Sequence, residues 1–170
     1  MRKQQIGYLF LWLLLFVTAI QFGAGVYERL IVIPQWSETP QPATLGASLQ
    51  ASGHTVSAHR FWPFVSPVVF VLALANCVLA WRHRGPARTW WLSGALSFTV
   101  ISIVTYAYFV PTMLSLMHDA ASYTEAELRT TVEKWVALSS GRSLLAIPAW
   151  AACARAQALN SSTRSEPSAS

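Results

Sequence analysis

The chain has 170 residues, of which 54% are hydrophobic and only 11% are charged. Soluble domains carry about 25% charged residues, so this composition excludes an ordinary water-soluble domain and favours a surface that faces lipid. The net charge is +5, but no basic run with interleaved aromatic residues accompanies it, which excludes a nucleic-acid partner.

Four apolar stretches divide the chain, each near the length of about 20 residues that crosses roughly 30 Å of hydrocarbon as a helix. They predict an all-α fold: a four-transmembrane-helix bundle with a long first outer loop and a capped outer extension of the fourth helix. We expect one integral membrane domain over residues 1–155, with helices over about 6–33, 61–82, 89–110 and 125–155. The Ser-rich segment 156–170 has little apolar surface to bury, so we expect a disordered cytoplasmic tail there.

The first helix has a basic start and is expected to stop at Pro34, because proline cannot continue a helix. A cleaved signal peptide has a shorter apolar core of about 7–15 residues, so we interpret this segment as a retained helix. The polar link over residues 34–60 has a length that is typical of a functional lid or a disordered connector. A short interfacial helix around residues 43–51 is the alternative.

The remaining helices are bounded by short links, proline and a capping signal. Only residues 82–88 join the second and third helices, so these two must be antiparallel neighbours. Pro111 is the expected stop or kink of the third helix. Thr124 and Glu127 have the spacing of a capping box, which predicts that the fourth helix begins outside the bilayer.

The distribution of charge predicts the orientation in the membrane. Basic residues lie before the first helix, between the second and third, and after the fourth, whereas six of the seven acidic residues lie on the other side. Loops that face the cytoplasm carry an excess of Lys and Arg, so we expect both termini to be cytoplasmic.

Helical spacing places polar and small residues on one face of each predicted helix. Polar groups in hydrocarbon need partners, so we expect these four faces to turn toward one another. The faces consist of Thr18, Gln21, Gly25 and Glu28; of Trp62, Ser66, Ala73 and Asn76; of Thr99, Ser102, Tyr106 and Phe109; and of Trp135, Ser139, Arg142 and Ala146.

Glu28 and Arg142 are the charged residues on these faces. Counting about 1.5 Å per helical residue places both in the outer half of the bilayer, at depths that differ by less than the length of an Arg side chain. A buried Arg stays protonated, so we expect Glu28 and Arg142 to pair directly or to share a bound anion or water. A pair that only fixes helix register is the alternative reading. Arg29 is expected to extend to the outer interface.

The cysteines and histidines give no strong signal. Cys77 and Cys153 form no CxxC motif and are expected to be small apolar side chains in the bundle. His54, His59 and His118 lie in the outer loops without the spacing of metal ligands, so we predict solvated histidines and no metal site.

Several short motifs carry a resemblance to a known family. With these motifs, the segment from about Ile6 to Ala154 resembles the anthrone oxygenase-like family of small four-helix membrane proteins, whose bacterial members are mostly uncharacterised. The motifs are Gly25–Glu28, Val32–Trp36, Arg60–Trp62, Tyr108–Thr112, Trp135–Leu138 and Gly141–Arg142.

The resemblance implies a cofactor-independent oxygenase of the bacterial cytoplasmic membrane that acts on a lipophilic aromatic or polyketide-like molecule. An anthrone is acidic at its central carbon, and its enolate can pass an electron to O₂ without metal or flavin. By that logic Glu28 is the catalytic base and Arg142 stabilises the oxyanion. The residues expected to bind the substrate are Tyr27, Trp36, Arg60, Trp62, Thr105, Tyr106, Phe109 and Trp135.

The alternative is a non-catalytic membrane protein that binds a lipid or small molecule, or that serves as an assembly partner in a membrane complex. A transporter is disfavoured because the four helices contain no internal repeat, and a channel is disfavoured because no ring of charge is present. The expected partners are the lipid bilayer and a lipophilic small molecule, and a homo-oligomer is left open.

Overall fold

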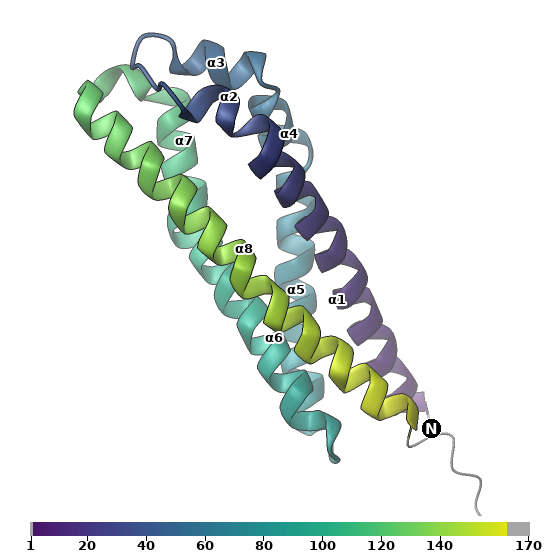
Figure 1. Cartoon of the computed structure of the whole chain (residues 1–170). Helices are drawn as coiled ribbons and strands as arrows, with labels where there is room; N and C mark the ends of the chain where they lie inside the picture. The colour runs from purple at the N-terminus through teal and green to yellow at the C-terminus, as the bar shows by residue number, and fades with distance from the viewer. Residues whose placement is uncertain (1, 163–170) are drawn as a thin grey trace, which may run out of the picture.

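The computed structural model describes residues 2–162, which form a long bundle of four helices with a group of short helices at one end (Figure 1). Both ends of the described chain lie at the opposite end of the bundle. In chain order the elements are α1 (Arg2–Tyr27), the π-helical turn η1 (Glu28–Val32), α2 (Pro34–Ser37), α3 (Leu45–Ala51), α4 (His54–Arg60), α5 (Trp62–Arg82), α6 (Ala87–Val104), the π-helical turn η2 (Thr105–Phe109), α7 (Val110–His118), the 3-10 turn η3 (Ala120–Ser122) and α8 (Glu125–Ser162).

Four helical segments are long and apolar enough to cross a membrane: Gln5–Val32, Trp62–Arg82, Ala87–His118 and Glu125–Asn160. Large apolar side chains such as Phe16, Phe64 and Leu144 are about two-thirds exposed on the outside of the bundle, where lipid would surround them. The predicted all-α fold with four membrane helices is therefore confirmed, and these segments identify an integral membrane protein.

The segment between the first two long helices is not a disordered connector. Its residues form α2, α3 and α4, which together we call the cap, and α3 confirms the predicted alternative of a short helix around residues 43–51. The cap buries three of its own apolar side chains against Leu116 of α7 and Leu128 of α8. These are Trp36, Leu45 and Leu49. Burial of these apolar side chains holds the cap on the end of the bundle.

Two of the long helices extend further than predicted. The third span continues through the π-helical turn η2 and past Pro111 to His118, so the predicted end near residue 110 is wrong. The fourth helix continues to Ser162, well beyond the predicted end at residue 155, because Ala156 is buried against the bundle and its neighbours are good helix formers. The last part of the predicted tail, residues 163–170, lies outside the described residues.

The capping box at the start of α8 is confirmed. The backbone N–H of Thr124 donates to Oε2 of Glu127 at 3.0 Å, and the backbone N–H of Glu127 donates to the Thr124 hydroxyl at 3.3 Å. These reciprocal bonds satisfy two donors at the helix start that have no partner within the helix.

A π-helical turn interrupts two of the long helices, each just before a proline. In η1 the N–H of Ile33 donates to the carbonyl of Glu28 at 2.8 Å, directly before Pro34. In η2 the carbonyl of Thr105 accepts in the same way from the residue before Pro111. Proline lacks an N–H and its ring clashes with the carbonyl four residues earlier, so a wider turn lets the helix continue. Such turns occur frequently at functional sites.

The half of the bundle that is distant from the cap is tightly packed. A Cβ on Gly94 of α6 would lie 2.5 Å from the Cys153 sulfur and 2.8 Å from the carbonyl oxygen of Ala149 on α8, so only glycine allows this approach. Nearby, the indole N–H of Trp91 donates to the side-chain oxygen of Asn76 at 2.8 Å. The packed region and the apolar core under the cap form two separate clusters of buried residues along the bundle.

Candidate functional site

A cavity of about 140 Å³ lies where η1, α4, the start of α5, η2 and the middle of α8 meet. Both π-helical turns contribute to it, since Glu28 belongs to η1 and Thr105 and Phe109 belong to η2. We call this cavity the chamber. Its lining includes Glu28, Arg29, His54, Trp62, Ser66, Thr105, Phe109, Met113, Trp135, Ser139, Arg142 and Ser143.

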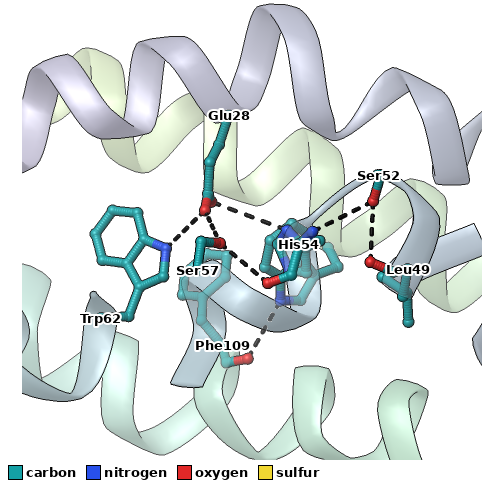
Figure 2. A network of polar contacts seen from close by, with 8 residues as sticks. Glu28, Leu49, Ser52, His54, Ser57, Trp62 and Phe109 are labelled. Atoms are coloured by element: carbon teal, nitrogen blue, oxygen red, sulfur yellow. Dashed lines mark hydrogen bonds and ion pairs between the residues drawn. The ribbon is translucent and has the colours of Figure 1, made fainter. Parts of the chain in front are cut away.

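Glu28 is the buried carboxylate of the chamber, with 7% of its surface exposed. Figure 2 shows it extending from the start of η1 toward Ser57 and His54 of α4 and Trp62 of α5. Its Oε1 accepts hydrogen bonds from the Ser57 hydroxyl and, at 2.9 Å, from the indole N–H of Trp62. These donors stabilise the negative charge that the apolar surroundings disfavour.

His54 lies beside this carboxylate and is 3% exposed. Its Nδ1 is 4.0 Å from Oε2 of Glu28, and this nitrogen has no hydrogen-bond partner within residues 2–162. The imidazole packs against the indoles of Trp36 and Trp135, at centroid distances of 5.2 and 6.2 Å. Burial lowers the pKa of His54 and the negative charge of Glu28 raises it, with burial the larger effect, so the ring is neutral at pH 7.

Arg142 is held on the α8 side of the chamber. Its Nη1 donates to the Thr105 hydroxyl at 2.8 Å, and its guanidinium carbon lies 4.4 Å from the centroid of the Phe109 ring. The hydroxyl and the aromatic face of η2 thus fix the cation by a hydrogen bond and a cation–π contact. Both partners come from one π-helical turn, which orients them toward α8.

Glu28 and Arg142 do not form the direct ion pair that was the first of the predicted arrangements. The structure gives Glu28 donors from the cap and α5, and it gives Arg142 an acceptor on η2. The two groups instead line the same chamber. This geometry is compatible with the other predicted arrangement, in which Glu28 and Arg142 share a bound anion or water.

The structure brings six of the predicted site residues together and separates the others. Tyr106 lines a second, adjoining cavity, and Trp36 is buried behind His54 in the aromatic cluster. Tyr27 is 60% exposed and Arg60 is also exposed, and neither lines the chamber, so the structure does not bring them together with the other predicted site residues. Each lies on the outward face of its helix. The residues brought together are Glu28, Trp62, Thr105, Phe109, Trp135 and Arg142.

His54 and Ser57 are the site residues that sequence reasoning missed. The expectation that His54 is a solvated loop residue is wrong, because α4 packs over the chamber and buries the ring. The two residues are three positions apart, which places them on one face of a helix. That spacing could have identified them had a helix been expected over residues 54–60. Within residues 2–162 no group of three or more His, Cys, Asp or Glu side chains is placed to hold a metal ion.

The chamber therefore combines a carboxylate, a neutral imidazole and a guanidinium with aromatic walls. Such a set can remove a proton from a weak acid, stabilise the oxyanion that forms, and exclude water from it.

Comparison with known protein families gives a match. A family model described as Anthrone oxygenase matches residues 54–152 of this chain, more than half of its length. The matched segment includes His54 and Arg142 and ends before the last turns of α8, whereas Glu28 lies before it. No curated protein and no solved structure matches the chain significantly.

Proposed function

The chain belongs to the anthrone oxygenase family, and we propose from its chamber that it is a membrane-embedded, cofactor-independent oxygenase of lipophilic aromatic or polyketide-like substrates. One observation carries the proposal: a buried carboxylate and a half-buried guanidinium from different helices line one largely apolar chamber. Buried ionisable groups that face a cavity within a membrane protein are expensive and are therefore functional-site candidates.

Glu28 is the proposed base. Its Oε1 is already occupied by two donors, whereas Oε2 receives no hydrogen bond within residues 2–162 and faces the chamber beside His54. Oε2 can therefore accept the proton of an acidic C–H group, and the neutral imidazole can relay it. A positioned general base contributes about 10²–10⁴-fold to a rate.

Arg142 is the proposed oxyanion partner. Deprotonation of a carbon beside a carbonyl moves the negative charge onto the oxygen, and a fixed cation in a low-dielectric site stabilises that charge strongly. Thr105 and Phe109 hold the guanidinium before substrate arrives, so little reorganisation accompanies the reaction.

The complete reaction balances without a further reductant. The enolate transfers an electron to O₂, the two radicals combine into a C–O bond, and protonation gives a hydroperoxide. Loss of water from that hydroperoxide leaves a ketone, so a CH₂ group and O₂ become C=O and H₂O. The protein residues move one proton, stabilise one charge and keep bulk water away.

Oxygen uptake by the purified protein in lipid nanodiscs, with an anthrone as substrate, tests this function. We expect uptake above that of empty nanodiscs, and a fall of about 10²–10⁴-fold in Glu28→Gln. The control is Glu133→Gln, which removes an exposed carboxylate that pairs with Arg129 on the surface of α8. Uptake that is equal in the Glu28→Gln variant and in wild type would contradict the role of Glu28.

A second candidate is a non-catalytic protein in which the same residues bind a lipid or a small molecule. The hydrogen bonds from Ser57 and Trp62 to Oε1 of Glu28 favour this candidate, because the same bonds would hold the cap to the bundle in a protein without catalytic activity. In that case Glu28→Gln should lower the thermal stability and leave no activity to lose. We also propose that both termini face the cytoplasm of a bacterial cell, on the basis of the basic residues near them.

A further inference from the structure

Two more cavities follow the chamber along the bundle, on the side of Arg142 that is distant from the cap. The first has a volume of about 60 Å³ and shares Gly25, Trp62, Ser66 and Arg142 with the chamber lining. Because these residues line both spaces, the two cavities adjoin, and only these residues separate them.

The next cavity along the bundle is larger and apolar, with a volume of about 290 Å³. It shares Phe22, Phe98 and Ala146 with the middle cavity. Phe98 is buried and forms its floor, whereas Phe22, Ile147 and Trp150 are 38%, 51% and 41% exposed. The cavity therefore opens between α1 and α8 on the lipid-facing side of the bundle, and we call it the side groove.

The side groove is closed at its far end. The indole N–H of Trp150 on α8 donates to the carbonyl of Leu15 on α1 at 3.1 Å and so joins the two helices. Beyond this bond lies the packed core around Leu11 and Leu14. Arg142 and Trp150 are eight residues apart on α8, so the tract from the cation to the closed end is about 12 Å long.

We propose that the site takes an amphipathic ligand that enters from the bilayer, with a hydroxyaromatic or enolic head in the chamber and an apolar tail in the side groove. The inference rests on the proposed function for the choice of an aromatic head. The tail is inferred from the succession of adjoining cavities and from the change in their lining. That lining runs from charged at Glu28 and Arg142 to aliphatic and aromatic at Ile147 and Trp150.

The charges of the chamber select the head group. A neutral hydroxyl can donate to Oε2 of Glu28 and accept from Arg142, so it satisfies both groups at once. The permanent negative charge of a phospholipid phosphate would face the Glu28 carboxylate and could not donate to it. A phospholipid is therefore a poorer occupant of the chamber and the side groove than a ligand whose head carries a neutral hydroxyl.

Gly25 lies at the junction between the chamber and the middle cavity, and it provides a direct way to block the tract. A Cβ on Gly25 would meet no atom within 4 Å, so the side chain of Gly25→Leu starts in open space at the junction and can extend into it. Gly23, on the same helix, is equally open but lines none of these cavities, so Gly23→Leu is the matched control.

The test uses a 2-alkyl-1-naphthol that carries a photoreactive diazirine at the end of an eight-carbon chain. After illumination in nanodiscs, mass spectrometry should find the label on Phe22, Ile147 or Trp150, and excess 1-naphthol without a chain should remove it. Gly25→Leu should lower this labelling about tenfold, whereas Gly23→Leu should keep it. Equal thermal unfolding of the two variants shows that both are folded.

Three outcomes would overturn the inference. Label spread evenly over all lipid-facing helices would show that the groove holds no particular tail. Labelling of the groove that 1-naphthol does not displace would show occupation by a lipid-like chain without engagement of the chamber. Label confined to the cap would place the tail elsewhere. The assay needs no turnover, so labelling in a protein that consumes no oxygen would refute the oxygenase and support the amphipathic ligand.

Discussion

Thr105→Val tests whether the π-helical turn η2 holds the cation of the site. The change keeps the size and branching of the side chain but removes the hydroxyl that accepts from Arg142 at 2.8 Å. This hydroxyl is the one hydrogen-bond acceptor that residues 2–162 offer to Arg142. The guanidinium would then remain in the chamber with the Phe109 ring as its remaining fixed contact.

The size of the effect follows from the charge of the donor. Hydrogen bonds to charged groups contribute about 1.5–3 kcal/mol, whereas an ordinary hydrogen bond within a membrane protein averages about 0.6 kcal/mol. For a chain of this length, 1 kcal/mol moves the melting temperature by roughly 2–4 °C. We therefore expect Thr105→Val to lower the melting temperature by about 3–12 °C.

Two control variants isolate the contact. Thr99 of α6 is also buried and its hydroxyl donates to the carbonyl of Ala95 at 2.9 Å, but it contacts no cation, so Thr99→Val should lower the melting temperature by only about 1–2 °C. Thr105→Ser keeps the hydroxyl and should remain close to wild type. The assay is thermal unfolding in one detergent. A Thr105→Val shift no larger than that of Thr99→Val would refute the assigned role of Thr105.

Three further predictions concern packing, protonation and the carboxylate network, and all are read from the same unfolding assay. Gly94→Ala places a Cβ 2.5 Å from the Cys153 sulfur and should destabilise the protein by about 1–3 kcal/mol through overpacking. Burial lowers the pKa of His54 below its ordinary value of 6.5, so the unfolded chain binds the additional proton first. The free energy of unfolding should therefore fall as the pH drops below 6.5 and level off below the folded-state pKa, and His54→Gln should reduce this slope. Trp62→Phe removes one donor to Glu28 and should lower the free energy of unfolding by about 1.5–3 kcal/mol.

Each of these variants has a matched control in the chain. A Cβ on Gly141 would meet nothing within 4 Å, so Gly141→Ala should be neutral or stabilising. His59 is exposed, so His59→Gln should leave the pH slope unchanged. Trp90 is 48% exposed and away from the network, so Trp90→Phe should have little effect. A variant that behaves like its control would show that the packing, the burial or the hydrogen bond is not as described.

The fold could be predicted from the sequence because the bilayer imposes a simple length requirement on apolar helices. The start of the fourth helix was also predictable, because Thr124 and Glu127 satisfy each other locally. The passage of the third helix through Pro111 was not. A proline normally ends a helix, and no local pattern in the sequence indicated the π-helical turn through which the helix continues past Pro111.

The candidate site was predicted in part. Glu28 and Arg142 were identifiable because a charged residue within an apolar helix needs a compensating environment. Their direct pairing was one of two expected arrangements, on the assumption that the polar faces of the first and fourth helices meet at similar depth and that no other segment takes part. The cap breaks that assumption, since α4 inserts Ser57 and His54 beside Glu28. The polar, proline-containing link gave no periodicity from which this placement could be derived.

The most direct test of the proposed chemistry is isotope incorporation. The purified protein in nanodiscs is given an anthrone and ¹⁸O₂ in the presence of a metal chelator, and the ketone product is analysed by mass spectrometry. We predict that one labelled oxygen atom enters the new carbonyl in wild type and that this product falls to the level of empty nanodiscs in Glu28→Gln. Unlabelled product, or labelled product formed equally by both proteins, would contradict a carboxylate-initiated reaction with O₂ in this chamber.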